Sequence, residues 1–498
     1  MTRYLLSILL LAFGSSMFAQ LSFQNTAAYQ HGNIPGNEPT NLNVFYDQLN
    51  LQYRWKPLRA SIRVEQFYSP DSLSGDYQKI SQFLLNYRKK GLELKLGNFY
   101  ETLGQGLLLR GYEIKNAIYE DPIYRVKQGF YKDMLGAYAG YSSKNFAVKL
   151  LSGRMLDNQL PITSDERREN YINAGEFRGI YDSYNLGVIL LNSTFSNSTK
   201  NFLSVFSSGT IGSGLNYYAE FASELVDSLS FFSTTTESRY GAYASVSYSG
   251  SGYGLSLEFK DYRNFFIGSG YSDPPTLAKE HTYRLLNRAT HIINLLDESG
   301  FQAEAFWNPW ENHMFTFNFS RNLNEGFRDF VSFEYFLEWY ATLDKHNQLK
   351  VFIDYSGDDV NFEPERYTAG LYYTRYFNKG WSASFESEWQ EVSRKFPNIP
   401  ANKYNNVYGS IAVNQSTKFS AAFVLEFSND PTAADLSNTD QIETERFYPG
   451  VNLSYRPDRK NTLQLFAGER RGGPACTAGI CYEVPDFKGI ELIWTLKL

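Results

Sequence analysis

Segments in which apolar and polar side chains strictly alternate constrain this fold more than any other feature of the sequence. In residues 381–391, Trp381, Phe385 and Trp389 fall on one side of an extended chain, and Glu388 falls on the other. Successive side chains of a β-strand point to opposite faces, so this pattern predicts strands with one face against an apolar medium and one against water. The same pattern recurs in residues 92–99, 254–260, 348–355, 418–427 and 489–498.

The apolar medium is predicted to be lipid rather than the facing sheet of a soluble sandwich. The alternating segments run to about ten residues, which is the length of a tilted strand that crosses a membrane. Aromatic residues make up 17% of the chain and gather near the segment ends, as they do at the two interfaces of a membrane barrel. After the N-terminal run, no segment has the roughly 18 consecutive apolar residues of a spanning helix.

The connections between the alternating segments are short and long in alternation along the chain. Links such as 56–57 and 90–91 are short, whereas 31–44, 155–170 and 472–486 are long. This layout predicts an all-β, transmembrane, antiparallel up-and-down β-barrel of about 24 strands, within a range of about 20–26, with short periplasmic turns and long external loops. The structural rival is a soluble β-propeller or solenoid, which would show a repeat of fixed period, and none recurs here.

Residues 1–19 are predicted to form an export signal. Arg3 supplies the positive end, Leu5–Phe13 forms the apolar run, and cleavage is expected after Ala19. The alternative, a buried N-terminal helix, does not explain the order of charged, apolar and small residues. The remainder, 20–498, is predicted to be a single barrel domain in the outer membrane of a Gram-negative bacterium.

The expected partners follow from this location. They are outer-membrane lipid and lipopolysaccharide, the barrel-assembly machinery during insertion, and, as candidates, components of secretion or surface complexes. A net charge of −6 argues against a nucleic-acid partner. Charges of both signs on the polar faces, such as Arg63 with Glu65 and Glu258 with Lys260, are expected to face the lumen and to pair there.

The longest segments without alternation, 101–133 and 264–299, are the candidates for a plug or gate in the lumen. The first contains Gly104, Gly106 and Gly111, but no Gly-Lys-Ser/Thr follows them as a phosphate loop requires. We therefore expect these glycines to serve bends or a close approach of the backbone.

The second segment contains a stretch, 273–300, that is predicted to be an amphipathic helix. Thr276 is the expected N-cap, after two prolines that end the preceding strand. The expected apolar face consists of Ala278, Leu285, Ala289, Ile292 and Leu296. The expected polar stripe, which is the candidate lumen or gate site, consists of Glu280, Arg284, Asn287 and His291, with Arg288 at its edge. The sharper hypothesis is a solute-binding or gating stripe; we favour a helix whose polar groups pair with the barrel wall.

Catalysis and metal binding find little support. The chain has five His without metal-ligand spacing, and it has no nucleophile elbow, so we expect no enzyme and no cofactor. Its two cysteines, Cys476 and Cys481, are favoured as a disulfide that closes a small loop, although two such thiols could also bind a metal.

Three stretches resemble an uncharacterised family of outer-membrane β-barrel proteins from the Bacteroidota. They are LGNFYETLGQGLLLR (96–110), PPTLAKEHTYRLLNRATHIIN (274–294) and RRGGPACTAGICYEVPDFKGIEL (470–492). The resemblance covers most of the mature chain and implies the fold and the location, but no reaction, substrate or catalytic residue. The resulting hypotheses are a channel or transporter with a loop-constricted lumen, and a non-conducting barrel that serves as a surface scaffold, adhesion protein or secretion or assembly subunit.

Overall fold

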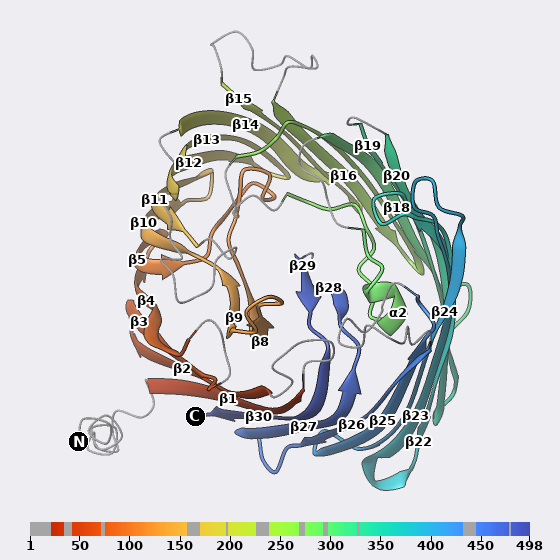
Figure 1. Ribbon diagram of the computed structural model, residues 1–498. Coiled ribbons are helices and arrows are strands. Elements are labelled where there is room, and N and C mark those ends of the chain that lie inside the picture. Colours follow the sequence, from red (N-terminus) through yellow and green to blue (C-terminus); the bar gives the residue numbers. More distant parts are fainter. Residues whose placement is uncertain are drawn as a thin grey trace, which may run out of the picture.

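The main sheet is a closed barrel. The computed structural model describes residues 21–33, 42–70, 75–156, 170–195, 198–225, 239–267, 274–291, 297–325, 329–431, 445–477 and 480–498. The sheet has 24 antiparallel strands, and β1 (Leu21–Asn33) pairs both with β2 (Leu42–Trp55) and with β30 (Phe487–Lys497), as Figure 1 shows. The predicted up-and-down barrel of about 24 strands is confirmed.

The other wall strands follow one another around the ring. They are β3 (Leu58–Tyr68), β4 (Tyr77–Lys89), β5 (Leu92–Phe99), β10 (Met134–Ser142), β11 (Phe146–Met155), β12 (Asn170–Tyr181), β13 (Tyr184–Phe195), β14 (Ser198–Ile211), β15 (Leu215–Glu224), β16 (Tyr240–Gly250), β17 (Tyr253–Arg263), β18 (Asp297–Trp307), β19 (His313–Asn324), β20 (Phe330–Asp344), β21 (Asn347–Asp358), β22 (Glu363–Tyr376), β23 (Trp381–Arg394), β24 (Asn402–Gln415), β25 (Phe419–Ser428), β26 (Arg446–Tyr455) and β27 (Asn461–Arg470). A short 3-10 helix, η1 (Asn378–Gly380), forms the turn before β23.

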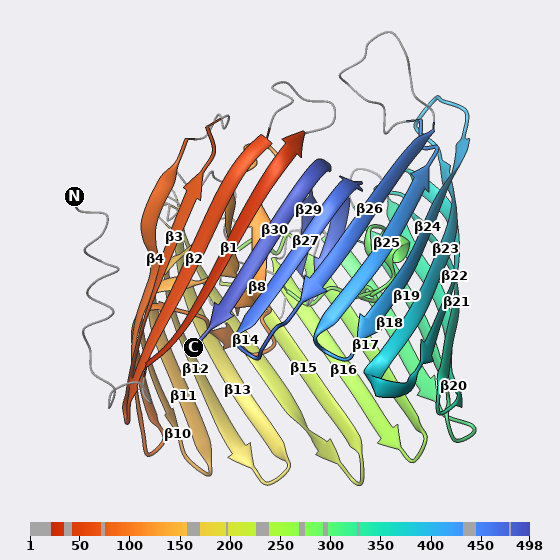
Figure 2. The same ribbon diagram turned by 90° about the horizontal axis from the view of Figure 1, so that it is seen from below.

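The two ends of the barrel differ. Short connections such as 56–57, 90–91 and 251–252 lie at one end, which we call the turn end, and the long connections lie at the other, the loop end. Figure 2 shows the strands running from the turn end, below, to the loop end, above, with the C-terminus at the turn end. No helix in the described part of the chain has the length and apolar character needed to cross a membrane.

The barrel wall is apolar outside and polar inside. Outward side chains such as Leu190, Ile411 and Phe423 remain 57%, 59% and 52% exposed, whereas the inward Lys260 and Glu388 are 0% and 1% exposed. A continuous apolar surface of this kind is unfavourable in water, by about 25 cal/mol for each Å² left uncovered, and suits lipid. The predicted inward charges Arg63, Glu65, Lys260 and Glu388 are buried, which confirms their side of the wall.

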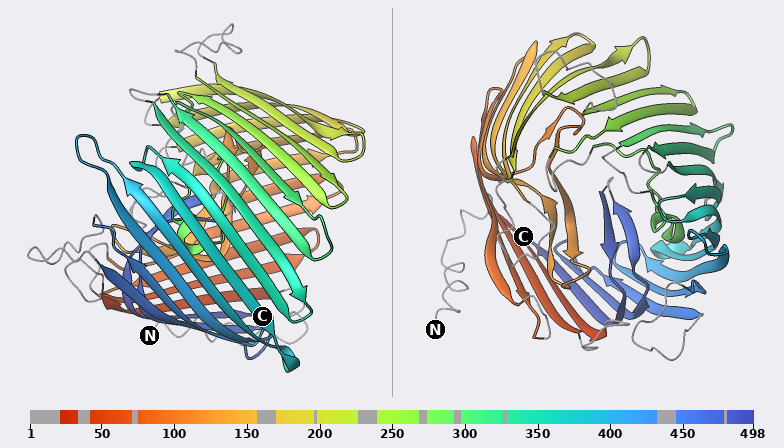
Figure 3. Two further views of the ribbon diagram at one scale, coloured as in Figure 1. Left: turned by 90° about the vertical axis from the view of Figure 1, so that its right-hand side faces the viewer. Right: turned by 45° about the horizontal axis from the view of Figure 1, so that its top comes forward.

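Three connections at the loop end fold into the lumen. Insert 1 (100–133) contains β6 (Thr102–Leu103), β7 (Leu109–Arg110), β8 (Tyr112–Glu120) and β9 (Lys127–Lys132). Insert 2 (264–267 and 274–291) contains α2 (Arg284–Asn287), and insert 3 (471–477 and 480–486) contains β28 (Gly473–Thr477) and β29 (Ile480–Val484). Figures 1 and 3 show these elements enclosed by the ring of strands. Inserts 1 and 2 coincide with the segments singled out from the sequence, but the prediction of residues 472–486 as an external loop is wrong.

Glycines from strands far apart in the sequence line up across the wall. Gly450, Gly468, Gly489 and Gly32 occupy paired positions on β26, β27, β30 and β1. Gly468 and Gly489 have φ angles of 139° and 153°, and a Cβ atom on Gly489 would lie 2.2 Å from the carbonyl oxygen of His31. This glycine row lets neighbouring backbones come closer than side chains allow, where the first and last strands join.

The substitution Gly489→Ala is expected to destabilise the barrel by about 1–3 kcal/mol, because the new Cβ atom would meet the backbone of β1 and the φ angle disfavours a side chain. Urea unfolding, followed by the gel migration of folded and unfolded barrel, measures the change. Gly409→Ala is the matched control, since its Cβ atom would meet no atom nearer than 3.9 Å. Equal stability of the two variants would contradict the steric explanation.

Candidate functional site

A strip of carboxylates on the inner wall faces insert 2. We call it the acidic strip, and it consists of Glu298, Glu304, Glu334, Glu338, Asp358, Glu388 and Glu426. These residues come from β18, β20, β21, β23 and β25, at positions whose side chains point inward. Each carboxylate of the acidic strip contacts a polar group of insert 2, so the wall supplies one acceptor for each of these contacts.

The first part of insert 2, residues 274–283, has no regular secondary structure, and Tyr283 at its end is extended. Lys279 forms an ion pair with Glu304, and the Tyr283 hydroxyl donates a hydrogen bond to Glu338. Between them, His281 Nε2 lies 2.7 Å from Glu334 Oε1. Three alternate residues therefore contact the wall, with a period of two rather than the period of a helix.

Within the described residues 274–291 and 297–300, the predicted helix is wrong except for one turn. That turn, α2, begins after the extended Tyr283 and not after Thr276, and the backbone N–H groups of Arg284 and Leu285 donate to the Glu388 carboxylate at 2.7 and 2.8 Å. A wall carboxylate thus satisfies donors that a helix N-terminus leaves open. Leu285 is buried, as predicted. Residues 292–296, with the predicted face residues Ile292 and Leu296, lie outside the described residues.

Arg288 anchors the end of α2 to the wall. Its guanidinium forms an ion pair with Glu426 and donates a hydrogen bond to the carbonyl oxygen of Arg471 at 2.7 Å. Burial lowers the pKa of Arg288 to about 10, and Glu426 opposes this effect while Arg284 and Arg471 add to it. Because Arg471 also contacts Glu426, at 3.3 Å, one carboxylate joins insert 2 to insert 3.

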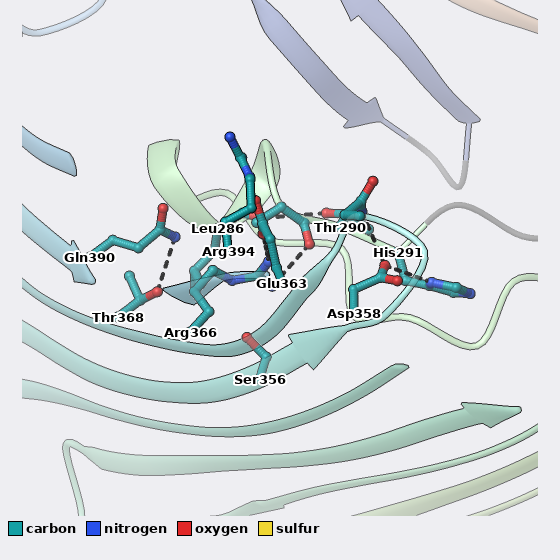
Figure 4. A network of polar contacts seen from close by, with 12 residues as sticks. Leu286, Thr290, His291, Ser356, Asp358, Glu363, Arg366, Thr368, Gln390 and Arg394 are labelled. Atoms are coloured by element: carbon teal, nitrogen blue, oxygen red, sulfur yellow. Dashed lines mark hydrogen bonds and ion pairs between the residues drawn. The ribbon is translucent and has the colours of Figure 1, made fainter. Parts of the chain in front are cut away.

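His291 lies between two wall carboxylates. Its Nδ1 atom is 3.0 Å from Asp358 Oδ2, and its Nε2 atom is 3.3 Å from Glu298 Oε2. Burial would lower the pKa of His291, but the hydrogen bonds to Asp358 and Glu298 outweigh it and raise the pKa to about 9. Glu298 also forms an ion pair with the buried Lys260, so a protonated His291 balances two carboxylates with two cations. Figure 4 shows His291 beside Asp358.

A second arginine holds the backbone next to His291. Arg366 donates a hydrogen bond to the carbonyl oxygen of Ala289 at 3.0 Å and forms an ion pair with Glu363 at 3.2 Å. Glu363 in turn accepts from Arg394 at 2.7 Å, as can be followed in Figure 4. The end of insert 2 is therefore fixed through both its side chain and its backbone.

Insert 3 connects the other two inserts. The Asn287 side chain donates to the carbonyl oxygen of Cys476 at 2.9 Å and accepts from its N–H at 3.0 Å. The structure joins Cys476 and Cys481 in a disulfide across the hairpin. On the other side of the hairpin, the ring of Tyr482 packs edge-on against Phe130 of insert 1, with ring centres 4.8 Å apart.

Insert 1 is held by apolar packing as well as hydrogen bonds. Leu103, Leu107 and Leu108 are fully buried against inward aromatic residues of the wall. The N–H of Gly104 donates to Glu176 at 3.1 Å, and a Cβ atom there would lie 2.5 Å from Glu220 Oε2. The expected close approach of the backbone at this glycine is therefore confirmed.

The candidate site residues differ in their surroundings. Asn287, Arg288 and His291 contact the wall or insert 3. Arg284 and Glu280 are exposed, and Arg284 Nε lies 3.8 Å from Glu426 Oε2 of the wall. The alternation in residues 381–391 and 418–427 puts Glu388 and Glu426 on polar strand faces, whereas the other members of the acidic strip were not predicted. Their inward positions on alternating strands were the available signal. Among the described residues, no group of three or more His, Cys, Asp or Glu is arranged to hold a metal ion.

The anchoring of insert 2 is expected to weaken as pH rises. Because the pKa of His291 is raised from 6.5 to about 9, its stabilising contribution is fully present below pH 6.5 and is lost as the pH passes 9. The loss is on the order of 3 kcal/mol for local opening. Hydrogen exchange of residues 274–291, corrected for intrinsic rates, should show faster opening at pH 9.5 than at pH 6. In His291→Gln, which does not titrate here, this pH dependence should disappear; an unchanged dependence would exclude His291 as its source.

Asn287→Ala is expected to separate inserts 2 and 3, since it removes two hydrogen bonds to Cys476 worth about 1–2 kcal/mol together. Exchange should accelerate in both 284–291 and 473–477. Asn308→Ala, at an exposed position in a short turn, provides the control. Acceleration confined to residues 284–291 would show that insert 3 does not depend on this contact.

Comparison with known proteins gives a family and a fold. A family model described as a family of unknown function, DUF6029, matches residues 8–131 and 206–498. A chain of the E. coli P pilus tip assembly intermediate PapC-PapD-PapK-PapG is similar with a TM-score of 0.52 at 11% identity, over 96% of this chain and 60% of that chain. At this identity the likeness concerns the fold alone.

Two further solved structures are similar at lower scores. The translocation pore of the P pilus usher PapC has a TM-score of 0.43 at 10% identity, over 96% of this chain and 99% of that chain. Pseudomonas aeruginosa OccK3 has a TM-score of 0.36 at 8% identity, over 97% of this chain and 99% of that chain. No curated protein matches the chain.

Proposed function

This chain belongs to the family of unknown function DUF6029, and we propose that it is an outer-membrane channel whose lumen is constricted by three inserts. The observation that carries the proposal is the way insert 2 is held. Its contacts with the wall combine the packing of Tyr283 and Leu286 against Phe336 and Phe352 with a series of ion pairs and hydrogen bonds. The polar contacts come from side chains such as Lys279, Arg288 and His291. Such contacts can be exchanged for contacts with water or a solute, so insert 2 is the part of the constriction suited to move.

The proposed location follows from the apolar outer surface and the arrangement of the connections. A barrel with lipid on the outside, short turns at one end and long loops at the other fits an outer-membrane protein with its turn end in the periplasm. The predicted export signal, residues 1–19, lies outside the described residues, and it stays a prediction together with the source in the Bacteroidota. Lipid and lipopolysaccharide around the wall and the assembly machinery during insertion are the partners we propose.

A second candidate function is a non-conducting barrel that serves as a surface scaffold, an adhesion protein or a secretion or assembly subunit. The packing of insert 1 favours it. Leu103, Leu107 and Leu108 are fully buried in an apolar cluster, which holds that insert against the wall more firmly than exchangeable polar contacts would. A permanently closed lumen would leave the loop end of the barrel as the functional surface.

Removing insert 2 distinguishes the two functions. In planar bilayers, a variant with residues 276–290 replaced by a short Gly-Ser linker is expected to conduct at least about twofold better than the unmodified chain, because a barrel of this size has a wide bore once its lumen is cleared. Gly-Ser replacement of the exposed residues 397–400, in the loop between β23 and β24, is the control and should leave the conductance unchanged. Absence of conductance in both the unmodified chain and the deletion variant would contradict the channel and support the scaffold.

A further inference from the structure

A polar cavity lies between insert 1 and the first strands of the wall. Its volume is about 590 Å³, within the range of pockets that enclose one small-molecule ligand. Inward side chains of β1 to β5 line one side, and Glu113, Lys115 and Asn116 of β8 line the other. The lining extends to Arg59 and Lys497, beside the turn end, while Phe99 and Tyr100 lie where the wall passes into insert 1.

Amide side chains dominate this cavity. Eight of its 22 lining residues are Asn or Gln, and only a few apolar side chains accompany them. An amide both donates and accepts hydrogen bonds, which is the property needed to bind neighbouring hydroxyl groups. The Oδ1 atom of Asn86 is buried and has no hydrogen-bond partner among the described residues, while its Nδ2 atom donates to Glu93 at 2.9 Å. Asn86 is thus a lining residue whose amide orientation is fixed by Glu93.

The charge of the cavity is positive. Five cationic side chains line it against two carboxylates, and Glu113 is already paired with Arg63. Arg59, Lys115 and Lys497 are exposed, and none of the ion pairs recorded among the described residues involves them. Cations on a polar, partly enclosed surface raise the local concentration of anions.

We propose that this cavity binds a small sugar acid, a mono- or disaccharide that carries a carboxylate. The amides would bind the hydroxyl groups, and Arg59, Lys115 and Lys497 would bind the carboxylate. Amide and charged side chains outnumber the apolar and aromatic ones in the lining, which favours a hydroxyl-rich anion over a lipid. The inference deepens the proposed function, on which it rests, because it names the class of solute that the lumen would admit.

Titration calorimetry on the detergent-solubilised full chain tests the proposal with galacturonate, galactose and acetate. Galacturonate is expected to bind at least about fivefold more tightly than either galactose, which lacks the carboxylate, or acetate, which lacks the hydroxyl groups. Arg59→Gln and Lys115→Gln should each weaken galacturonate about fivefold and leave galactose unchanged. Asn86→Ala should weaken both sugars.

Lys418→Gln is the matched control, because this exposed lysine lies in a turn away from the cavity. Heat-dependent gel migration verifies that every variant is folded. Absence of galacturonate binding, equal affinity for galacturonate and acetate, or equal weakening by Lys418→Gln and Lys115→Gln would each overturn the proposal. Binding of galacturonate without conductance in bilayers would contradict the channel function and support the sugar-acid site. Conductance without galacturonate binding would contradict the site and support the channel function.

Discussion

The pairing of β1 with β30 is the interaction on which the rest of this structure depends. An open sheet would expose a row of unpaired N–H and C=O groups, each of which costs several kcal/mol in hydrocarbon. Closure removes both edges at once and divides the chain's side chains into an outer and an inner set. Because the ring is complete, the alternation along every strand places apolar groups outward and charged groups toward the lumen.

Closure also creates the problem that the inserts solve. A ring of 24 strands encloses more space than inward side chains fill, and many of those side chains are carboxylates or cations. A buried charge is tolerated when a partner of opposite sign or a hydrogen-bond donor reaches it. The acidic strip and insert 2 meet this condition together, since Glu388 binds backbone N–H groups, Glu426 binds Arg288, and Asp358 and Glu298 share His291.

The sequence predicts the wall better than the lumen, for a physical reason. A period of two along residues such as 381–391 is local and repeats in each strand, so strand number and the inward charges follow from it. Insert 2 has helical spacing as well, but Lys279, His281 and Tyr283 also alternate, and wall carboxylates on distant strands select that arrangement. No pattern within the sequence of insert 3 predicts that it folds into the lumen. It is held there by a contact between Cys476 and Asn287, which are 189 residues apart in the sequence.

The glycine row has a consequence for the order of assembly. Its members belong to the first strand and to three of the last strands, so the close approach of their backbones cannot form until the C-terminal strand has been made and placed. A chain interrupted before Gly489 would keep most of its wall but would leave β1 and β27 as open edges, which are sites of aggregation. The close backbone contact between Gly489 and β1 therefore forms only after β30 has been made, and it distinguishes closed barrels from open ones.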